Sequence, residues 1–284
     1  MYVADSEAGL PPFARTPIPA FMRTDSLLRA SLGRCGARTA ALRIHEAGAL
    51  RLRFPRVGGA CEGIILNTSG GIAGGDRQRQ AFTLGEGARA ALTTQSAEKI
   101  YRSDGEIAHI ETRLDISAGA EFALLPQEAI LFDGARLSRR LDVNMAADAV
   151  LTIKEGVMFG RTAMAETMRR GSFHDRWRIR RDGRLIFAED VRLDGDIAAT
   201  LERAALGNGA RAIATIVHVA PDAAAKLDTV REALENLDCD AGASAWNGML
   251  VVRLAGSLPH HIRSAAAAVL SRLLPSVSPR IWSC

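Results

Sequence analysis

The stretch LNTSGGIAGGDRQRQAFTLGEGARAALTTQSAEKIYRS, residues 66–103, decides the fold class. Four glycines stand close together before Asp76; they are Gly70, Gly71, Gly74 and Gly75. Glycine tolerates positive φ and allows backbones to approach closely, so the pattern predicts a tight turn that presents the Asp76 carboxylate. The two runs that follow, 77–84 and 88–94, alternate in polarity and predict two β-strands joined by a turn.

A markedly polar segment follows the second of these strands. It consists of Thr93-Thr94-Gln95 and, two residues later, Glu98-Lys99-Ile100-Tyr101-Arg102. A structural core does not need this combination, because buried polar groups are costly unless they find partners. The segment therefore indicates that something is held or bound here.

Strand-like runs and turn signals alternate through most of the chain. Further strands are predicted at 49–54, 63–66, 107–116, 122–125, 130–132, 137–143, 149–153, 177–180 and 184–187. Asp182 and Gly183, between the last two runs, form the strongest short-range hairpin signal. So many closely spaced strands favour sheet packed on sheet, or a coiled sheet, over an α/β fold. No sequence repeat of fixed period is found, so a regular solenoid does not follow from the residues alone.

Two segments in the last third have helical periodicity instead. Apolar residues recur at intervals of three and four over 222–237 and 259–274, which predicts two amphipathic helices. A buried strand is expected between them at 249–254. The expected organisation is one domain over 1–284. It comprises a mobile arm (1–20), a β-rich body (21–200) and an α+β part (201–284).

Composition and charge exclude several classes of protein. Hydrophobic residues make up 48% of the 284 residues, which is enough for a sizeable core, and no run of 18 apolar residues predicts a membrane span. The N-terminus does not have the basic and apolar regions of a signal peptide. Cys35, Cys61, Cys239 and Cys284 form no CxxC pair, so we expect reduced thiols and a cytoplasmic protein.

Familiar catalytic and ligand-binding signatures are missing from the sequence. Residues 70–76 have neither dinucleotide-binding spacing nor the Lys-Ser/Thr pair of a P-loop. No Ser stands in a G-x-S-x-G motif, and the six His form no zinc pattern. The basic stretch 169–184 places Arg176, Arg178 and Arg180 on one strand face. That face is either solvated or a contact for an acidic protein, with nucleic acid the least favoured partner.

Several carboxylates sit at turns or strand ends beside apolar runs. They are Asp76, Glu98, Glu128, Asp133, Glu155 and Glu166. Most surface carboxylates only improve solubility, and those at turns often accept hydrogen bonds from nearby amides. A line of carboxylates along an internal path would differ, because oxygen ligands can hold a divalent metal weakly and release it.

The order of the motifs resembles the family of the urease accessory protein UreD, also called UreH. The residues that carry the resemblance are Gly70, Gly71, Gly74, Gly75 and Asp76; Thr93, Thr94, Gln95, Lys99, Tyr101, Arg102 and Ser103; Leu125, Pro126, Gln127 and 130–132; Gly160, Arg161, Ala163, Met164 and Glu166; and Pro279, Arg280, Ile281 and Trp282. Each motif alone is weak, but their order from residue 66 onward is specific. Ala165 is a departure, because the family usually has glycine before this glutamate.

The resemblance implies a mainly β fold of coiled, β-helix-like stacked sheets with two amphipathic helices in the C-terminal third. It implies a scaffold and nickel-delivery component of urease maturation, not an enzyme, with no permanently bound cofactor and nickel in transit. The implied partners are UreF, the GTPase UreG through UreF, and apo-urease, with no nucleic acid and no membrane. We expect the two helices to form much of the UreF contact.

Two alternatives stay open. One is a β-rich hydrolase that uses Asp76 and Glu166 as a carboxylate pair, and the other is an assembly scaffold that binds no metal. For the leading hypothesis we predict weak nickel binding by Asp76 and Glu166, with Glu98 and Asp133 along the same path. Carboxylates suit this role because nitrogen and sulfur ligands hold nickel more strongly.

Overall fold

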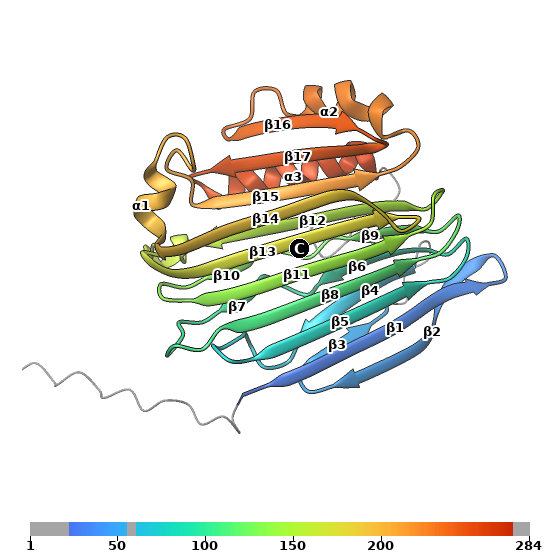
Figure 1. Ribbon diagram of the computed structural model, residues 1–284, viewed down its shortest axis with the longest axis horizontal. Helices are drawn as coiled ribbons and strands as arrows, with labels where there is room; N and C mark the ends of the chain where they lie inside the picture. The colour runs from blue at the N-terminus through green and yellow to red at the C-terminus, as the bar shows by residue number, and fades with distance from the viewer. Residues whose placement is uncertain (1–22, 56–60, 275–284) are drawn as a thin grey trace, which may run out of the picture.

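The computed structural model describes residues 23–55 and 61–274. Two β-sheets face each other, and two of the helices cover part of the outer face of the ten-stranded sheet (Figure 1). The seven-stranded sheet has the order β14-β13-β11-β8-β5-β1-β2. The ten-stranded sheet has the order β16-β17-β15-β12-β9-β6-β4-β3, and the short strands β7 and β10 pair beside this path.

The strands of the seven-stranded sheet are β1 (Asp25–Cys35), β2 (Arg38–Ala47), β5 (Arg77–Leu84), β8 (Ala108–Ile116), β11 (Arg136–Met145), β13 (Arg170–Arg181) and β14 (Arg184–Asp196). Those of the ten-stranded sheet are β3 (Leu50–Arg53), β4 (Cys61–Asn67), β6 (Arg89–Thr94), β7 (Glu98–Ile100), β9 (Glu121–Leu124), β10 (Ala129–Leu131), β12 (Val150–Phe159), β15 (Ala212–Val219), β16 (Asp240–Trp246) and β17 (Met249–Gly256). The α-helices are α1 (Ile197–Glu202), α2 (Leu227–Ala233) and α3 (Pro259–Leu273), and short 3-10 helices occupy Thr162–Met164 and Ala223–Lys226. Each predicted strand corresponds to an observed one.

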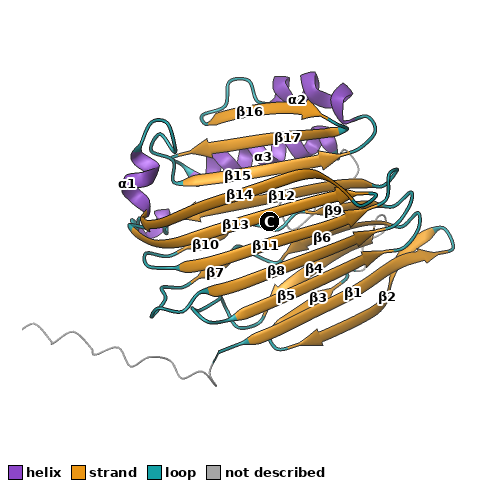
Figure 2. Ribbon diagram, viewed as in Figure 1, coloured by secondary structure: helices purple, strands orange, loops and turns teal. Residues whose placement is uncertain are grey.

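Successive strands in the middle of the chain alternate between the sheets, so the chain coils. β5, β8, β11 and β13 are parallel neighbours in one sheet, and β4, β6, β9 and β12 are parallel neighbours in the other. Parallel neighbours need a crossover connection, which here is the strand of the opposite sheet. The mainly β, solenoid-like prediction is confirmed, although no sequence repeat signals it (Figure 2).

The core between the sheets follows from the alternation of side chains along each strand. In β11 the buried residues are Leu137, Arg139, Leu141, Val143 and Met145, while the residues that alternate with them face outward. Each fully buried Leu or Val contributes roughly 1.5–3 kcal/mol relative to an exposed one. Arg139 is the one polar residue in this buried series.

The C-terminal part continues the ten-stranded sheet. β15 pairs antiparallel with β12, and β17 and β16 follow it outward. Helix α3 packs its apolar stripe on the outer face of β15 and β17, which confirms the predicted helix at 259–274. The helix predicted over 222–237 is wrong in length. It is a 3-10 turn followed by the shorter α2, because Asn236 adopts a left-handed conformation with φ 57° just beyond the helix.

Some elements were not predicted. β1, β2, β15 and β16 have few bulky side chains in strict alternation, and α1 is too short for a clear helical period. The basic strand face is as predicted, since Trp177 and Ile179 are buried while Arg176 is exposed. The predicted arm at 1–20 and the motif residues Pro279, Arg280 and Trp282 lie outside the described residues.

Candidate functional site: polar groups inside the coil

The glycine turn holds the polar segment that follows it in the next strands. A Cβ on Gly71 would lie 2.5 Å from the Tyr101 ring, and one on Gly74 would lie 2.4 Å from Ser103 Oγ. The Tyr101 hydroxyl donates to the Gly70 carbonyl at 2.8 Å. The polar segment therefore binds the glycine turn of the same chain, and glycine is required there because a Cβ would collide with Tyr101 or Ser103. Binding of anything else by this segment stays a prediction.

The second and third motifs also pack together, in successive coils. The Thr94 hydroxyl accepts from the Gln127 amide at 2.9 Å, and the Gln127 side chain donates to the Gln95 carbonyl at 3.1 Å. The Pro126 carbonyl accepts from Lys154 Nζ at 3.3 Å. These residues fix the register between coils, which explains why motifs about thirty residues apart belong together.

Asp76 is a structural group at a corner of the coil. Its side chain is 6% exposed and accepts from the Thr24 amide at 2.7 Å and the Ala73 amide at 2.8 Å. Both carboxylate oxygens are thus used to tie the start of β1 to the glycine turn.

A second corner brings together two predicted site residues, Asp133 and Glu166. Glu166 accepts from the Asp133 amide at 2.7 Å and pairs with Arg161, while Asp133 accepts from the Arg169 amide at 2.8 Å. Hydrogen bonds from the 169–170 backbone and from the Arg169 side chain, together with the charge of Arg169, outweigh a partial burial and hold the pKa of Asp133 below its usual range. Arg102 and Lys99 do not pair with either acid among the described residues.

Ala165, which stands where the family usually has glycine, has an unusual backbone conformation at this corner. Ala165 ends the 3-10 turn with φ 52°, a left-handed conformation in which glycine is more stable. Gly160, which has φ 104°, must also be glycine, since a Cβ would lie 2.3 Å from the Glu166 carbonyl.

Glu98 differs from the other predicted acids because it faces a polar cavity. The cavity has a volume of about 140 Å³ and is lined in part by Asn67, Gln78, Gln80 and Thr94. Asn67 Nδ2 donates to Glu98 at 3.0 Å. Burial raises the pKa of Glu98 to about 7, against the hydrogen bonds from Asn67 and Gln78 that favour its charged form.

A ladder of aligned residues continues from this cavity across the inner face of the seven-stranded sheet. Its members, in register from β1 to β14, are Ser26, Gln78, Ile110, Arg139, Asp175 and Val191. Four of these six are polar, and those four are at most 7% exposed. We call this row the interior ladder.

Arg139 and Asp175 form the charged part of the interior ladder. Arg139 donates to Asp175 through Nε at 3.0 Å and Nη2 at 2.6 Å, and it also pairs with Glu155 of β12 in the opposite sheet. Trp177 Nε1 donates to Asp175 at 3.0 Å. Burial opposes charge on Arg139, but attraction to Asp175 and Glu155 holds the pKa of Arg139 above its ordinary value. Burial raises the pKa of Glu155, against the attraction of Arg139.

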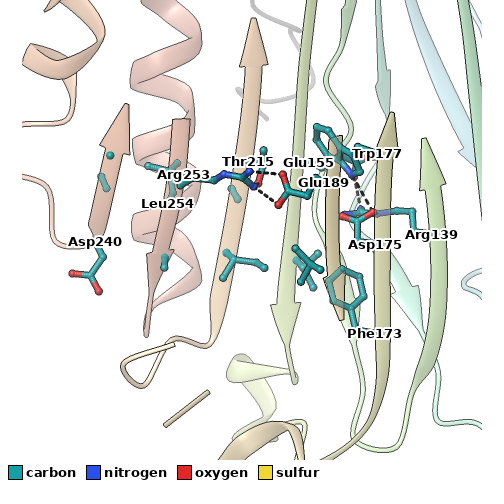
Figure 3. A pocket seen from close by; sticks show the side chains of 17 residues that line it. Arg139, Glu155, Phe173, Asp175, Trp177, Glu189, Thr215, Asp240, Arg253 and Leu254 are labelled. Atoms are coloured by element: carbon teal, nitrogen blue, oxygen red, sulfur yellow. Dashed lines mark hydrogen bonds and ion pairs between the residues drawn. The ribbon is translucent and has the colours of Figure 1, made fainter. Parts of the chain in front are cut away.

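These groups open into a larger cavity of about 370 Å³ between β12–β14 and β15–β17. Figure 3 shows Arg139 and Asp175 pointing toward each other on one side of it, while Arg253 extends from β17 toward Glu189 on the other. Arg253 Nη1 also donates to Thr215 Oγ1 at 2.8 Å. Oxygen atoms on both walls therefore face a shared space.

The sequence contains a signal for the charged part of the interior ladder. Arg139 lies between Leu137 and Leu141, and Asp175 between Phe173 and Trp177, always at the inward phase of an alternating strand. A charged residue at an inward position is costly unless paired, and this pattern marks Arg139 and Asp175 as partners. Glu189 and Arg253 offer no comparable pattern, because they meet only through sheet topology.

The predicted residues do not all gather at one place. Among the described residues, no hydrogen bond or ion pair joins Asp76 to Glu166, since each has its own set of partners. No three His, Cys, Asp or Glu side chains in residues 23–55 and 61–274 lie close enough together to hold a metal ion. In the same residues, no helix has the length and apolar character that a membrane crossing requires.

The apolar stripes of the C-terminal helices are not free for a partner. Ile262, Val269 and Leu273 of α3 are buried against the ten-stranded sheet, as is Val230 of α2. The UreF contact stays a prediction, but the exposed apolar stripe that motivated it is occupied.

The coiled sheets and the interior ladder define a class: a two-sheet β-solenoid with polar groups inside and helices on one outer face. The model of the UreD urease accessory protein family matches residues 25–283. Urease accessory protein UreD from Methylobacterium sp. (strain 4-46) is 48% identical over 87% of this chain and 90% of its own length. Urease accessory protein UreD 2 from Methylorubrum populi is 43% identical, over 94% and 92%. UreD from Xanthobacter autotrophicus is 44% identical, over 92% and 90%.

The chain therefore belongs to the UreD family of urease accessory proteins.

Proposed function

We propose that this protein is a non-catalytic, cytoplasmic scaffold in urease maturation that passes nickel along its interior ladder. In this proposal it connects UreF, and UreG through UreF, to apo-urease, and it holds no permanent cofactor. The single observation that carries the proposal is the aligned interior row that joins the Glu98 cavity to the Glu155 cavity, in which Gln78, Arg139 and Asp175 are buried polar residues and Ile110 stands between the first two. Family membership supports the accessory role.

The chemistry of the row suits a metal in transit. Amide, hydroxyl and carboxylate oxygens bind a divalent cation more weakly than imidazole or thiolate, so the ion can leave again. Arg139 is matched by two carboxylates, Asp175 and Glu155. A cation that engages Glu155 leaves the two-point contact between Arg139 and Asp175 intact, so the passage does not have to unfold.

The corner acids have a different place in the proposal. Asp76, Asp133 and Glu166 already accept backbone hydrogen bonds, so they support the corners past which the metal moves. Their direct contact with nickel stays a prediction. Glu98 is the member of the predicted set that faces a cavity.

The test compares Glu155→Gln and Glu98→Gln with Glu111→Gln, an exposed carboxylate on β8. Each variant is assembled with UreF, UreG and apo-urease, and urease nickel content and activity are measured at limiting nickel. We expect nickel loading to fall roughly tenfold for the interior variants and to stay unchanged for the control. Full loading by correctly assembled interior variants would overturn the nickel route and favour a scaffold without metal. Loss of the UreF complex would show that the residues are needed for folding, not transport.

A hydrolytic function is the less supported candidate. Asp76 and Glu166 would have to act as a pair across one substrate, at roughly 5–9.5 Å. Each carboxylate is instead occupied at its own corner by amides or by Arg161.

A further inference from the structure

A groove of about 770 Å³ lies on the outer face of the ten-stranded sheet, away from the interior ladder. It crosses the strands in the order β12, β9, β6 and β4, marked by Thr152, Ala123, Arg89 and Cys61. The turn between β1 and β2 forms one wall with Arg34 and Arg38. The proposed function does not use this groove.

The groove begins where the described chain ends. Leu274, the first residue after α3, is one of its lining residues. Helices α2 and α3 pack over β15, β16 and β17, which is the other half of this outer face. Residues on the β6–β9 half, Ala91 and Leu125, nevertheless belong to the same apolar cluster as α3 and are at most 1% exposed. The outer face is thus apolar beyond the part that the described helices contact most.

The next ten residues of the chain, PSVSPRIWSC, have a composition that matches the groove. Val277, Ile281 and Trp282 are its large apolar residues. Pro275 and Pro279 suit an extended segment that crosses strands, because such a segment cannot join the hydrogen-bond ladder of the sheet. Trp282 can also stack on an arginine of the wall, since indole rings attract guanidinium groups.

The length is also sufficient. Three steps from β12 to β4 span roughly 14 Å, because neighbouring strands lie about 4.8 Å apart. Ten residues in polyproline conformation extend roughly 30 Å. We propose that residues 275–284 bind in this groove and complete the outer face of the ten-stranded sheet, with Ile281 and Trp282 as the apolar anchors.

Charged residues that line the groove favour one orientation of the bound segment. Glu121 is the carboxylate among its described lining residues, and it can accept Arg280 beside its existing partner Arg89. Arg34 and Arg38 are exposed and have no ion-pair partner among the described residues, so they are available to the Trp282 ring.

Val150 lines the groove at an outward position of β12, in register with the exposed Glu121, so Val150→Cys places a thiol probe there, and all chains compared below carry this substitution. Cys61 is not suitable, because it pairs with Ala90 at an inward position and packs against the core between the sheets. The rate of N-ethylmaleimide modification is measured for each cysteine by peptide mass spectrometry in the full chain, in a chain that stops after Leu274, and in full-length Ile281→Ser/Trp282→Ser. In both altered chains the thiol introduced at position 150 should be modified about tenfold faster than in the full chain. Cys35, which is exposed, and Cys239, which lies outside the groove, serve as matched controls and should not change.

Addition of a synthetic peptide of residues 275–284 to the shortened chain should restore slow modification of the thiol introduced at position 150. If the shortened chain fails to fold, the full-length double variant decides the question. Equal modification rates at position 150 in the full chain and in a folded Ile281→Ser/Trp282→Ser variant would overturn the proposal. Protection that depends on protein concentration would overturn it as well, because a second copy of the chain would then be covering the groove.

Discussion

The acids at the corners of the coil and the acids inside it have opposite environments. Asp76 and Asp133 accept from backbone amides, which are fixed by the fold. Glu155 and Asp175 are satisfied by the side chains of Arg139 and Trp177, and Glu98 faces amide side chains around a cavity. Backbone donors cannot move without local unfolding, whereas side chains can change rotamer.

This difference suggests that the corner acids maintain the shape of the coil, whereas the interior acids take part in metal transport. Corner acids hold successive coils in register, so their removal should act on stability first. Interior acids can exchange one partner for another, so their replacement by a neutral isostere should act on metal loading and leave stability largely intact. The predictions below test this separation through stability, in order of decreasing effect.

Arg139→Met should have the largest effect. It leaves Asp175 and Glu155 buried without their cation, and loss of one partner from a buried pair costs about 3–5 kcal/mol of unfolding free energy. Urea unfolding measures this loss. The triple variant Arg139→Met/Asp175→Asn/Glu155→Gln should recover most of it. A triple variant no more stable than the single one would show that Arg139 acts through packing on Phe173, not through charge.

Asp76→Ala should have the next largest effect. It leaves the Thr24 and Ala73 amides without an acceptor, which costs roughly 2 kcal/mol for two partly buried donors. Asp76→Asn keeps one acceptor oxygen and should lose about half as much. Thermal unfolding of both variants beside Glu98→Gln tests the contrast between corner and interior. An Asp76→Ala variant as stable as the parent protein would contradict the structural role of the corner acids.

The sequence predicted most strands and the C-terminal helix α3 because alternation and helical period are local signals. It could not predict the coil from the residues, since strands of different length and composition make up each turn. The resemblance to a family supplied that architecture. Edge strand β2, with exposed Leu42 and Ile44, breaks the alternation that a half-buried strand would have.

The site was predictable to a lesser degree, for a physical reason. Turn glycines and turn carboxylates stand out in a sequence, which favours Asp76 and Glu166 as site residues, but the hydrogen-bonding capacity of both is used by neighbouring groups. Arg139 and Asp175 stand out only when their inward phase is counted. The contact between Glu189 and Arg253 joins residues 64 positions apart, on strands of different sheets, and no local pattern encodes it.

The pH dependence of stability should single out Glu98. Its pKa is raised from 4.5 to about 7 in the folded protein, so the folded state binds the proton more tightly than the unfolded chain. Stability contributed by this group is present below about pH 4.5 and is lost as the pH rises to about 7. For a partly buried group the loss is roughly 2 kcal/mol.

His218 makes stability depend on pH in the opposite direction, because its pKa is lowered from 6.5 to about 4, chiefly by burial. The unfolded chain then binds the proton more tightly, so stability rises with pH across that range. Glu98→Gln removes the pH dependence that comes from Glu98 and leaves that of His218 in place. The difference in unfolding free energy between Glu98→Gln and the parent protein, measured from pH 4.5 to 8, should therefore grow in favour of the variant. A difference that stays constant with pH would show that Glu98 is not held in a costly charged state.

Ala165→Gly should have the smallest effect and the opposite direction. Ala165 sits at φ 52°, where a Cβ costs roughly 1–2 kcal/mol, while the added freedom of glycine in the unfolded chain costs about 0.4–1 kcal/mol. The net expectation is a gain of between about 0 and 1.6 kcal/mol, measured by urea unfolding. Ala163→Gly is the matched control, because Ala163 is exposed in the same 3-10 turn and does not have positive φ. The Ala163→Gly variant should be destabilised or unchanged.

The gain at Ala165 should vanish when Glu166→Gln weakens the pairing with Arg161, if the corner is held in this strained shape by that ion pair. A gain that persists unchanged in the Glu166→Gln background would show that the backbone alone sets the corner, and that this acid does less for shape than Asp76 does.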